Sequence, residues 1–226
     1  MKCLKKVVNK MYVKSFIKVL IIPFFFFIFN YLLLFIFNLI YINTDYHKSS
    51  YSYDEYFNNY INTVDFNNKL NTFLDNQILI ITLITLIVFI PIIIKNYKKY
   101  YHKQNLKIKD ILLLMIIGIV LSLIVNTLLV NNVKISFLKI ITTSIIGPIL
   151  EEFIYRGILY NKLKEFNSNR TSIIISSVIF GLIHINPIKI IYTFILGIIL
   201  AKIYEMKKTL KAPIITHISF NLTAIL

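Results

Sequence analysis

Long apolar runs alternate with short polar stretches along most of the 226-residue chain. The runs are continuous rather than alternating between apolar and polar residues, which excludes the strands of a membrane barrel. Several of them reach the roughly 20 apolar residues that an α-helix needs to cross about 30 Å of hydrocarbon. The pattern predicts an all-α polytopic membrane protein with about seven transmembrane helices. The predicted helices cover residues 19–41, 77–94, 111–130, 135–163, 172–186, 188–204 and 212–226.

Two of these helices, 172–186 and 212–226, are unusually short. Each has about 15 residues and a length of roughly 22 Å, less than the hydrocarbon thickness. Short helices that carry polar residues favour local thinning of the bilayer and entry of water.

The polar stretches predict the orientation of the chain. Lysines gather in residues 1–18 and 95–109, which the positive-inside rule assigns to the cytoplasm. Residues 43–76 are rich in Asn, Tyr and acidic side chains and are predicted to form a polar loop on the outer side. A short outer turn follows at 131–134. The N-terminus is therefore expected in the cytoplasm and the C-terminus outside, and the chain divides into regions 1–130 and 131–226.

Composition narrows the class and the partners. With 57% hydrophobic residues and a mean hydropathy of +0.72, the chain is no soluble domain. A net charge of +15 suggests a nucleic-acid partner, but the lysines sit at the ends of the predicted helices, where anionic lipid is the natural partner. The single Cys3 permits no internal disulfide and fits no metal-ligand spacing. The bias toward Lys, Asn and Ile, with little Arg and Gly, is typical of an AT-rich bacterium and indicates a bacterial cell membrane.

Candidate chemistry is concentrated in one apolar helix. Of the ten acidic residues, only Glu151 and Glu152 lie deep within an apolar run. An ionisable side chain there costs on the order of 2.5–3.5 kcal/mol, so it usually marks a functional site. Glu152 and Arg156 have the i, i+4 spacing of a helical ion pair, which leaves Glu151 free on a neighbouring face. The alternative is a purely structural ion pair.

Two later helices carry polar pairs with the same spacing. Phe180 and His184 share one helix face, and so do His217 and Asn221. Counted from the cytoplasmic ends, Glu151 and His184 lie roughly 18 Å deep and Asn221 roughly 13 Å deep. The sequence therefore predicts that these residues meet in one cavity.

Together these spacings resemble the three motifs of the CAAX protease and bacteriocin-processing family, also called CPBP or Abi, of intramembrane glutamic endopeptidases. The residues that carry the resemblance are Glu151, Glu152, Arg156, Phe180, His184, His217 and Asn221. The match covers roughly residues 136–226, so the resemblance implies a catalytic bundle formed by the last four helices. The first 130 residues carry no resemblance.

The resemblance implies hydrolysis of a peptide bond by a water molecule activated between Glu151 and His184. His217 and Asn221 would donate to the developing oxyanion, a task that suits fixed donors. Glu152 and Arg156 would hold the motif helix, and Phe180 would pack beside the site. No cofactor is expected.

Three alternatives remain open at this point. A zinc-dependent protease would use nearly the same residues, but the chain has no His-Glu-x-x-His helix. A non-catalytic bacteriocin-immunity or membrane partner protein would retain the motifs as remnants, although all the motif positions are intact. A proton-coupled transporter could use Glu151 and His184 as a relay, but the inverted halves typical of such proteins are missing.

The expected substrate is a peptide or protein, such as a bacterial peptide precursor or a self-immunity target. Membrane lipids are the other expected partners, and no nucleic acid is expected. No pattern in the sequence indicates an oligomeric state.

Overall fold

The structure, a computed structural model, describes residues 2–97, 105–127 and 137–225, with side chains from residue 16 onward except at position 97. Every regular element in these ranges is helical, which confirms the predicted all-α fold. The elements are α1 (Lys2–Lys48), α2 (Tyr53–Asn58), η1 (Tyr60–Asn62), α3 (Val64–Tyr97), α4 (Ile108–Asn126), α5 (Phe137–Lys139), η2 (Ile140–Ile146), α6 (Gly147–Glu152), η3 (Phe153–Tyr160), α7 (Asn161–Lys164), α8 (Asn169–Leu182), α9 (Pro187–Lys207) and α10 (Lys211–Ile225).

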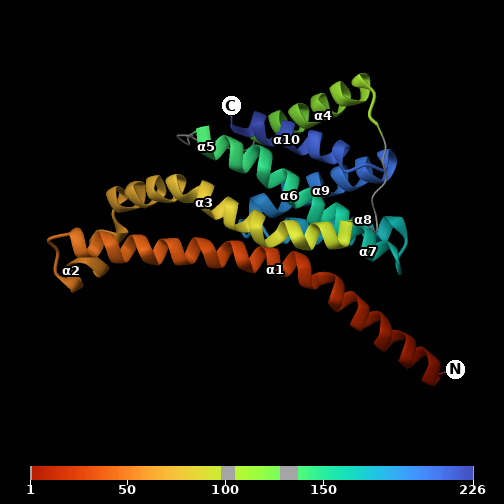
Figure 1. Cartoon of the computed structure of the whole chain (residues 1–226), viewed down its shortest axis with the longest axis horizontal. Helices are drawn as coiled ribbons and strands as arrows, with labels where there is room; N and C mark the ends of the chain where they lie inside the picture. The colour runs from red at the N-terminus through yellow and green to blue at the C-terminus, as the bar shows by residue number, and fades with distance from the viewer. Residues whose placement is uncertain (1, 98–104, 128–136, 226) are drawn as a thin grey trace.

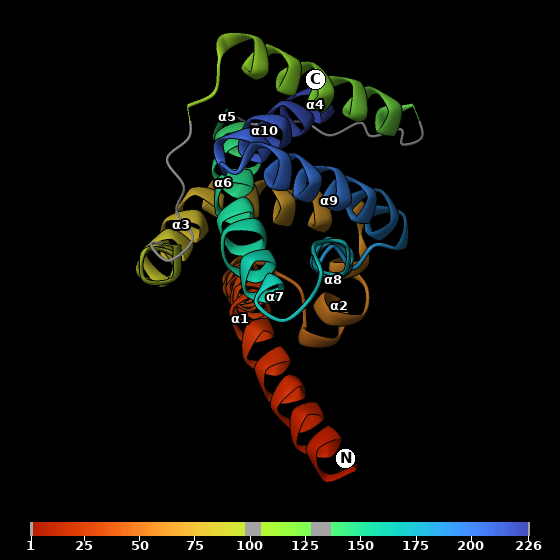
Figure 2. The same ribbon diagram turned by 90° about the vertical axis from the view of Figure 1, so that its right-hand side faces the viewer.

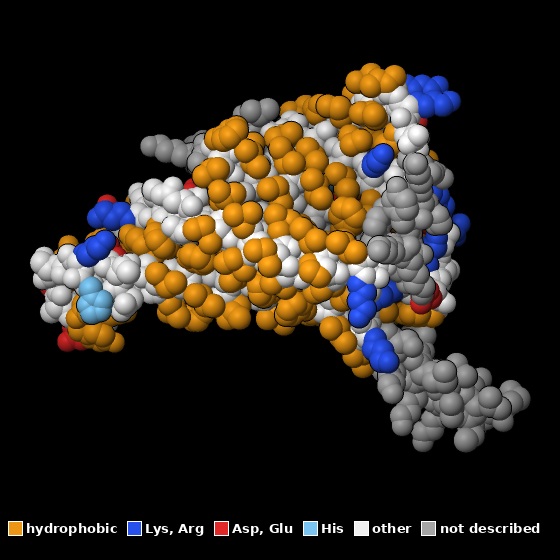
Figure 3. Space-filling view, viewed as in Figure 1, with side chains coloured by type: hydrophobic (Ala, Val, Ile, Leu, Met, Phe, Trp, Pro, Cys, Tyr) orange, Lys and Arg blue, Asp and Glu red, His pale blue; other side chains and the backbone are white. Residues whose placement is uncertain are grey.

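Within the part of the chain that the structure describes, four helical segments are long and apolar enough to cross a membrane, namely Phe16–Lys48 of α1, Val64–Asn96 of α3, α4 and α9. The remaining predicted spans correspond to the helix that runs without a break from α5 to α7, and to α8 and α10. With 14 and 15 residues, α8 and α10 are short, as predicted. Apolar side chains cover the middle of the surface, whereas lysines and arginines gather toward its ends (Figure 3), as expected for a multi-pass membrane protein.

The helices stack in layers (Figures 1 and 2). Helices α1 and α3 lie side by side along one edge, α6, α8 and α9 form the middle, α10 lies above them, and α4 is outermost. The largest apolar core joins the N-terminal helices to the middle layer, because Phe26 and Phe89 pack in one cluster with Ile154 and Phe180. The regions 1–130 and 131–226 therefore share a core.

The prediction that residues 43–76 form a loop is wrong. Helix α1 continues to Lys48 and α3 begins at Val64, so most of this stretch is helical. It contains no Gly or Pro to interrupt a helix. Tyr56 is buried at the tip of this hairpin, and its hydroxyl donates to Asp45 Oδ2 at 3.0 Å. Burial and this hydrogen bond raise the pKa of Tyr56.

Two sequence expectations fall outside the described residues. The short turn predicted at 131–134 lies there, and so does the segment 98–104 of the predicted cytoplasmic loop.

At one end of the bundle, Glu205 of α9 joins the ends of several helices. Its carboxylate accepts hydrogen bonds from the Tyr160 hydroxyl at 2.7 Å, from Lys164 Nζ at 2.8 Å and from Asn169 Nδ2 at 2.9 Å. These donors come from η3, α7 and α8. The contacts fix the helix that carries the glutamate pair against its neighbours.

Helix α10 owes its position to a close approach by α4. A Cβ atom added at Gly118 would lie 2.3 Å from the Thr216 carbonyl oxygen and 2.8 Å from Ser219 Cβ. Both neighbours belong to α10, and Thr216 directly precedes His217. The missing side chain at Gly118 therefore sets the distance between α4 and the helix that carries His217.

We expect Gly118→Ala to destabilise the protein by about 1–3 kcal/mol, because the Thr216 backbone cannot move aside cheaply. An ordinary Gly→Ala change inside a helix has the opposite effect and stabilises the protein by roughly 0.5–1 kcal/mol. Thermal unfolding in detergent, followed by size-exclusion chromatography, measures the effect. Ile116→Ala, on an exposed position of the same helix, is the control. An unchanged or higher melting temperature for Gly118→Ala would contradict this packing.

Candidate active site

The glutamate pair lies on α6, between two π-helical segments. These segments, η2 and η3, precede and follow the six residues of α6 within one continuous helix. Wide π-type turns inside α-helices are rare and are often found at functional sites. The Asn161 side-chain amide donates to the Arg156 and Gly157 carbonyl oxygens, which stabilises the end of η3.

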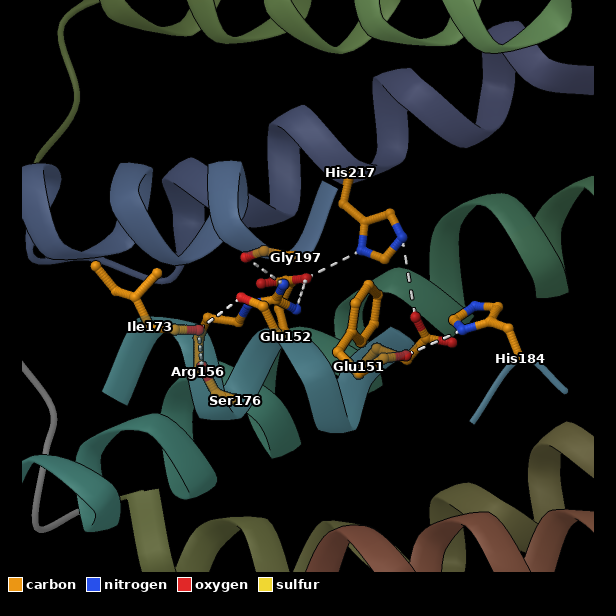
Figure 4. Close-up of polar contacts among 10 residues, drawn as sticks. Glu151, Glu152, Arg156, Ile173, Ser176, His184, Gly197 and His217 are labelled. Carbon is orange, nitrogen blue, oxygen red and sulfur yellow. Dashed lines mark hydrogen bonds and ion pairs between the residues drawn. The ribbon is translucent and has the colours of Figure 1, made fainter. Parts of the chain in front are cut away.

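Glu152 is fully buried and has two partners. Its Oε1 atom lies 2.7 Å from an Arg156 guanidinium nitrogen and 3.0 Å from His217 Nδ1 (Figure 4). Since an ionised carboxylate only accepts hydrogen bonds, Nδ1 of His217 is the donor. The predicted pair of Glu152 and Arg156 is confirmed as a contact. Its extension to His217, 65 residues further along the chain, is not visible in the sequence.

Arg156 is also buried and is held on three sides. Besides Glu152, its guanidinium group donates to the Gly197 carbonyl oxygen at 3.2 Å. Its central carbon lies 4.5 Å from the centre of the Phe180 ring, the geometry of a cation–π contact. A Cβ atom at Gly197 would lie 3.2 Å from Phe180 Cδ1, so the absence of a side chain there allows α9 to approach.

Phe180 packs at the centre of the site. Its ring lies edge-on to those of His184 and His217, with centroid distances of 5.4 Å and 5.8 Å. The ring is fully buried. It therefore separates the two imidazoles and fixes their planes, as the packing role expected for Phe180 requires.

Glu151 is the accessible member of the pair. Its side chain is 23% exposed, and Oε2 lies 3.8 Å from His217 Nε2 (Figure 4). His217 therefore stands between the two carboxylates, with Nδ1 toward Glu152 and Nε2 toward Glu151. Only Glu151 faces open space.

His184 lies in the turn between α8 and α9. Its Nδ1 atom is 3.0 Å from the Phe180 carbonyl oxygen. A carbonyl oxygen can only accept, so we assign the proton to Nδ1, which leaves Nε2 of the neutral ring with a lone pair. Ile185 follows with a positive φ of 56°, an unusual conformation for a β-branched residue. The turn that orients His184 therefore contains a strained backbone position at Ile185.

Asn221 reaches across from α10 to the helix that carries the glutamates. Its Nδ2 atom donates to the Thr143 carbonyl oxygen at 3.0 Å. One N–H of the amide is used in this bond, and the other is available to the cavity that Asn221 lines with His217.

Two cavities meet at Glu151 and His184. The smaller, of about 240 Å³, is also lined by His217 and Asn221. The larger, of about 400 Å³, extends between the same two residues and helices α1 and α3. All four residues expected to act in catalysis are thus brought together around one space. Phe180 lines the same space, while Glu152 and Arg156 lie behind it.

Sequence reasoning missed several residues of this site. Lys189 lines both cavities, and its position in an apolar run was a signal that could have found it. Gly197 and the residues of α1 and α3 that line the larger cavity carried no such signal, because their role depends on tertiary packing.

A zinc ion would need several of the same side chains as ligands. Within the described residues, no three His, Cys, Asp or Glu side chains come together as ligands. Glu152, one of the side chains that could serve as a ligand, is already engaged by Arg156 and His217.

Comparisons with known proteins agree with the motifs. Residues 133–223 match a family model described as "Type II CAAX prenyl endopeptidase Rce1-like". The chain is 38% identical over 84 residues to the "Putative membrane peptidase YdiL" of Bacillus subtilis, an alignment that covers 37% of this chain and 34% of the relative. It is 36% identical over 85 residues to the "Membrane-embedded CAAX protease MroQ" of Staphylococcus aureus, covering 34% of each.

A "UPF0177 protein in abiGi 5'region" of Lactococcus lactis is 28% identical over 148 residues, or 55% of this chain and 62% of the relative. The matches to YdiL and MroQ span about a third of the length of those relatives. No solved structure matches the chain. The comparisons confirm the resemblance to CAAX-type membrane proteases for the C-terminal region, and the family model does not extend to residues 1–132.

We expect Glu152→Gln and Arg156→Met each to destabilise the protein by about 3–5 kcal/mol, because each leaves a buried charge without its counter-ion. The pair of Asp65 and Lys69 has the same i, i+4 spacing and the same 2.7 Å distance, but is largely exposed. Asp65→Asn is therefore a matched control and should have little effect. Thermal unfolding in detergent compares the variants. If Glu152→Gln melts like the wild type, the shared carboxylate does not support the site.

Proposed function

We propose that the chain is an intramembrane endopeptidase in which Glu151 and His184 activate a water molecule. The observation that carries the proposal is the meeting of Glu151, His184, His217 and Asn221, from three separate segments of the chain, around one cavity. The similarity of the C-terminal region to membrane proteases supports the same reaction class.

In this mechanism Glu151 is the general base. It is partly exposed to the cavity and has no cationic partner closer than the 3.8 Å to His217 Nε2 among the described residues. Glu151 takes a proton from the water, whose oxygen attacks the carbonyl carbon of the scissile peptide bond. The lone pair on His184 Nε2 orients the same water.

His217 and Asn221 stabilise the oxyanion of the tetrahedral intermediate. Asn221 offers its second amide N–H, and His217 offers Nε2–H when the ring is an imidazolium. In that state the charges of Glu151, Glu152, Arg156 and His217 sum to zero, which suits a site with little water. Collapse of the intermediate breaks the C–N bond, and the proton held by Glu151 passes to the leaving amine.

The reaction needs no metal ion in this proposal. Glu152 is held by Arg156 and His217 and is therefore a poor candidate ligand. A zinc site that used Glu152 as a ligand would require its contacts to be broken, at the cost of a buried Arg156 without a partner.

The proposed substrate is a peptide chain at the bacterial cell membrane, such as a peptide precursor or a self-immunity target. We further propose that the N-terminus is cytoplasmic and the C-terminus outside, since basic residues flank α1 and α3 at the same end.

Glu151→Gln should abolish cleavage while leaving the fold intact, because it removes the base without unpairing a buried charge. We expect a loss of about 10²–10⁴-fold in rate. Proteoliposomes with a pooled set of labelled bacterial precursor peptides, read by mass spectrometry, test this. Glu55→Gln at the exposed hairpin tip is the control, and a chelator should have no effect. Unchanged cleavage by Glu151→Gln would refute the mechanism, and inhibition by the chelator would favour the zinc alternative.

Asn221→Ala should lower kcat by about 10²–10³-fold with little change in KM, as expected for the loss of an oxyanion donor. Asn126→Ala is a matched control. Asn126 also donates across helices, to the Thr223 carbonyl oxygen at 3.3 Å, but it lies outside both cavities. Equal losses in the two variants would indicate that Asn221 acts only by joining helices.

A further inference from the structure

The larger cavity is built in part by helices that lie outside the family match. Helix α1 contributes Phe26, Phe27, Asn30 and Tyr31 to its lining, and α3 contributes Thr82 and Thr85. Its volume of about 400 Å³ is in the range of sites that hold a small ligand or a few residues of a peptide. Because it opens directly onto Glu151 and His184, whatever occupies it is presented to the proposed catalytic pair.

The lining of this cavity mixes apolar side chains with polar ones, among which threonine hydroxyl groups are the most numerous. Thr82, Thr142 and Thr143 each donate their hydroxyl proton to a carbonyl oxygen of their own helix, at 2.7–2.8 Å. Their oxygens therefore keep only acceptor capacity toward the cavity. Such a lining suits a ligand with apolar side chains and N–H donors, which is the chemistry of an extended peptide.

Lys189 is the cation of this site. Among the described residues that line the two cavities, it is the only lysine or arginine. It lies in the first turn of α9, five residues after His184, and lines both cavities. No ion pair with Lys189 is formed among the described residues, so its ammonium group is available to a ligand.

The backbone of Lys189 is firmly held. Its amide donates to the Asn186 side-chain oxygen at 3.2 Å, and its carbonyl oxygen accepts from the Thr193 hydroxyl. Its side chain is exposed, at the start of a helix that is otherwise apolar in this region. An ionisable group in an apolar run is a functional candidate by default. The ordinary alternative is a lysine whose side chain extends to the membrane surface.

From these observations we infer that the larger cavity binds a short apolar segment of the substrate and that Lys189 pairs with a carboxylate of that segment. This inference rests on the proposed function and deepens it. Lys189 would be a specificity-determining residue. It would not touch the scissile bond, but it would fix the distance between that bond and the negative charge of the substrate. The carboxylate can be the C-terminal group of a peptide or an Asp or Glu side chain.

Binding tests the inference separately from cleavage. Full-length Glu151→Gln protein in nanodiscs is titrated with one fluorescent apolar hexapeptide in four forms, followed by fluorescence anisotropy. The forms are a free C-terminal carboxylate, a C-terminal amide, the amide with a terminal Glu, and the amide with a terminal Gln. We expect carboxylate forms to bind about tenfold more tightly than their neutral matches. Comparing the first and third forms identifies the source of the carboxylate.

Adding Lys189→Met should abolish this preference, and Lys189→Glu should reverse it, so that the neutral forms bind more tightly than the carboxylate forms. Lys202→Met, an exposed lysine on the same helix but outside both cavities, is the matched control and should keep the preference. A preference that survives Lys189→Met, or equal binding of all four peptides, would overturn the inference.

A second pair of variants locates the peptide. Thr82→Trp fills the larger cavity alone and should block binding, whereas Ala224→Trp lies on the smaller cavity and should not. The opposite pattern would overturn the assignment to the larger cavity. If the carboxylate preference depends on Lys189 but wild-type protein cuts none of the peptides in the pool, the proposed protease activity fails while this binding site stands.

Discussion

A carboxylate without access to solvent forms the centre of this molecule. Glu152 Oε1 is 2.7 Å from the Arg156 guanidinium group and 3.0 Å from His217 Nδ1, and Arg156 in turn reaches the Gly197 carbonyl oxygen. These contacts link α6, η3, α9 and α10. Separating them in an apolar environment would leave a charge unpaired, which costs more than the loss of an exposed ion pair. The cluster therefore fixes how the helices that carry the site meet.

The same interaction places the two adjacent glutamates in different environments. Because Glu152 is held in the interior, the helix presents Glu151 on its neighbouring face to both cavities. His217 is turned by its bond to Glu152 so that Nε2 points toward Glu151. The buried ion pair of Glu152 and the accessible Glu151 are thus adjacent in sequence. The ion pair orients His217, which lies beside Glu151.

The sequence was informative where the interactions are local. The i, i+4 spacing of Glu152 and Arg156 predicted their contact, and the lengths of the apolar runs predicted short α8 and α10 helices. It failed where distant segments meet. The bond between Glu152 and His217 spans 65 residues, and no local pattern encodes it. The stretch 43–76 looked like a loop because it is polar, yet helix formation depends more on the absence of Gly and Pro.

The division of the site between two regions has a consequence for specificity. The proposed catalytic residues all belong to the segment that matches the family model, whereas α1 and α3 supply much of the wall of the larger cavity. These helices pack against the helix that carries Glu151 through an apolar core. Changes on the cavity side of α1 and α3 can therefore alter which peptide fits without disturbing the charges around Glu152. Lys189 differs from the residues of α1 and α3, because the turn that holds His184 leads directly into the first turn of α9, which carries Lys189. The selection of a charge and the position of the proposed water-activating histidine therefore depend on the same short segment.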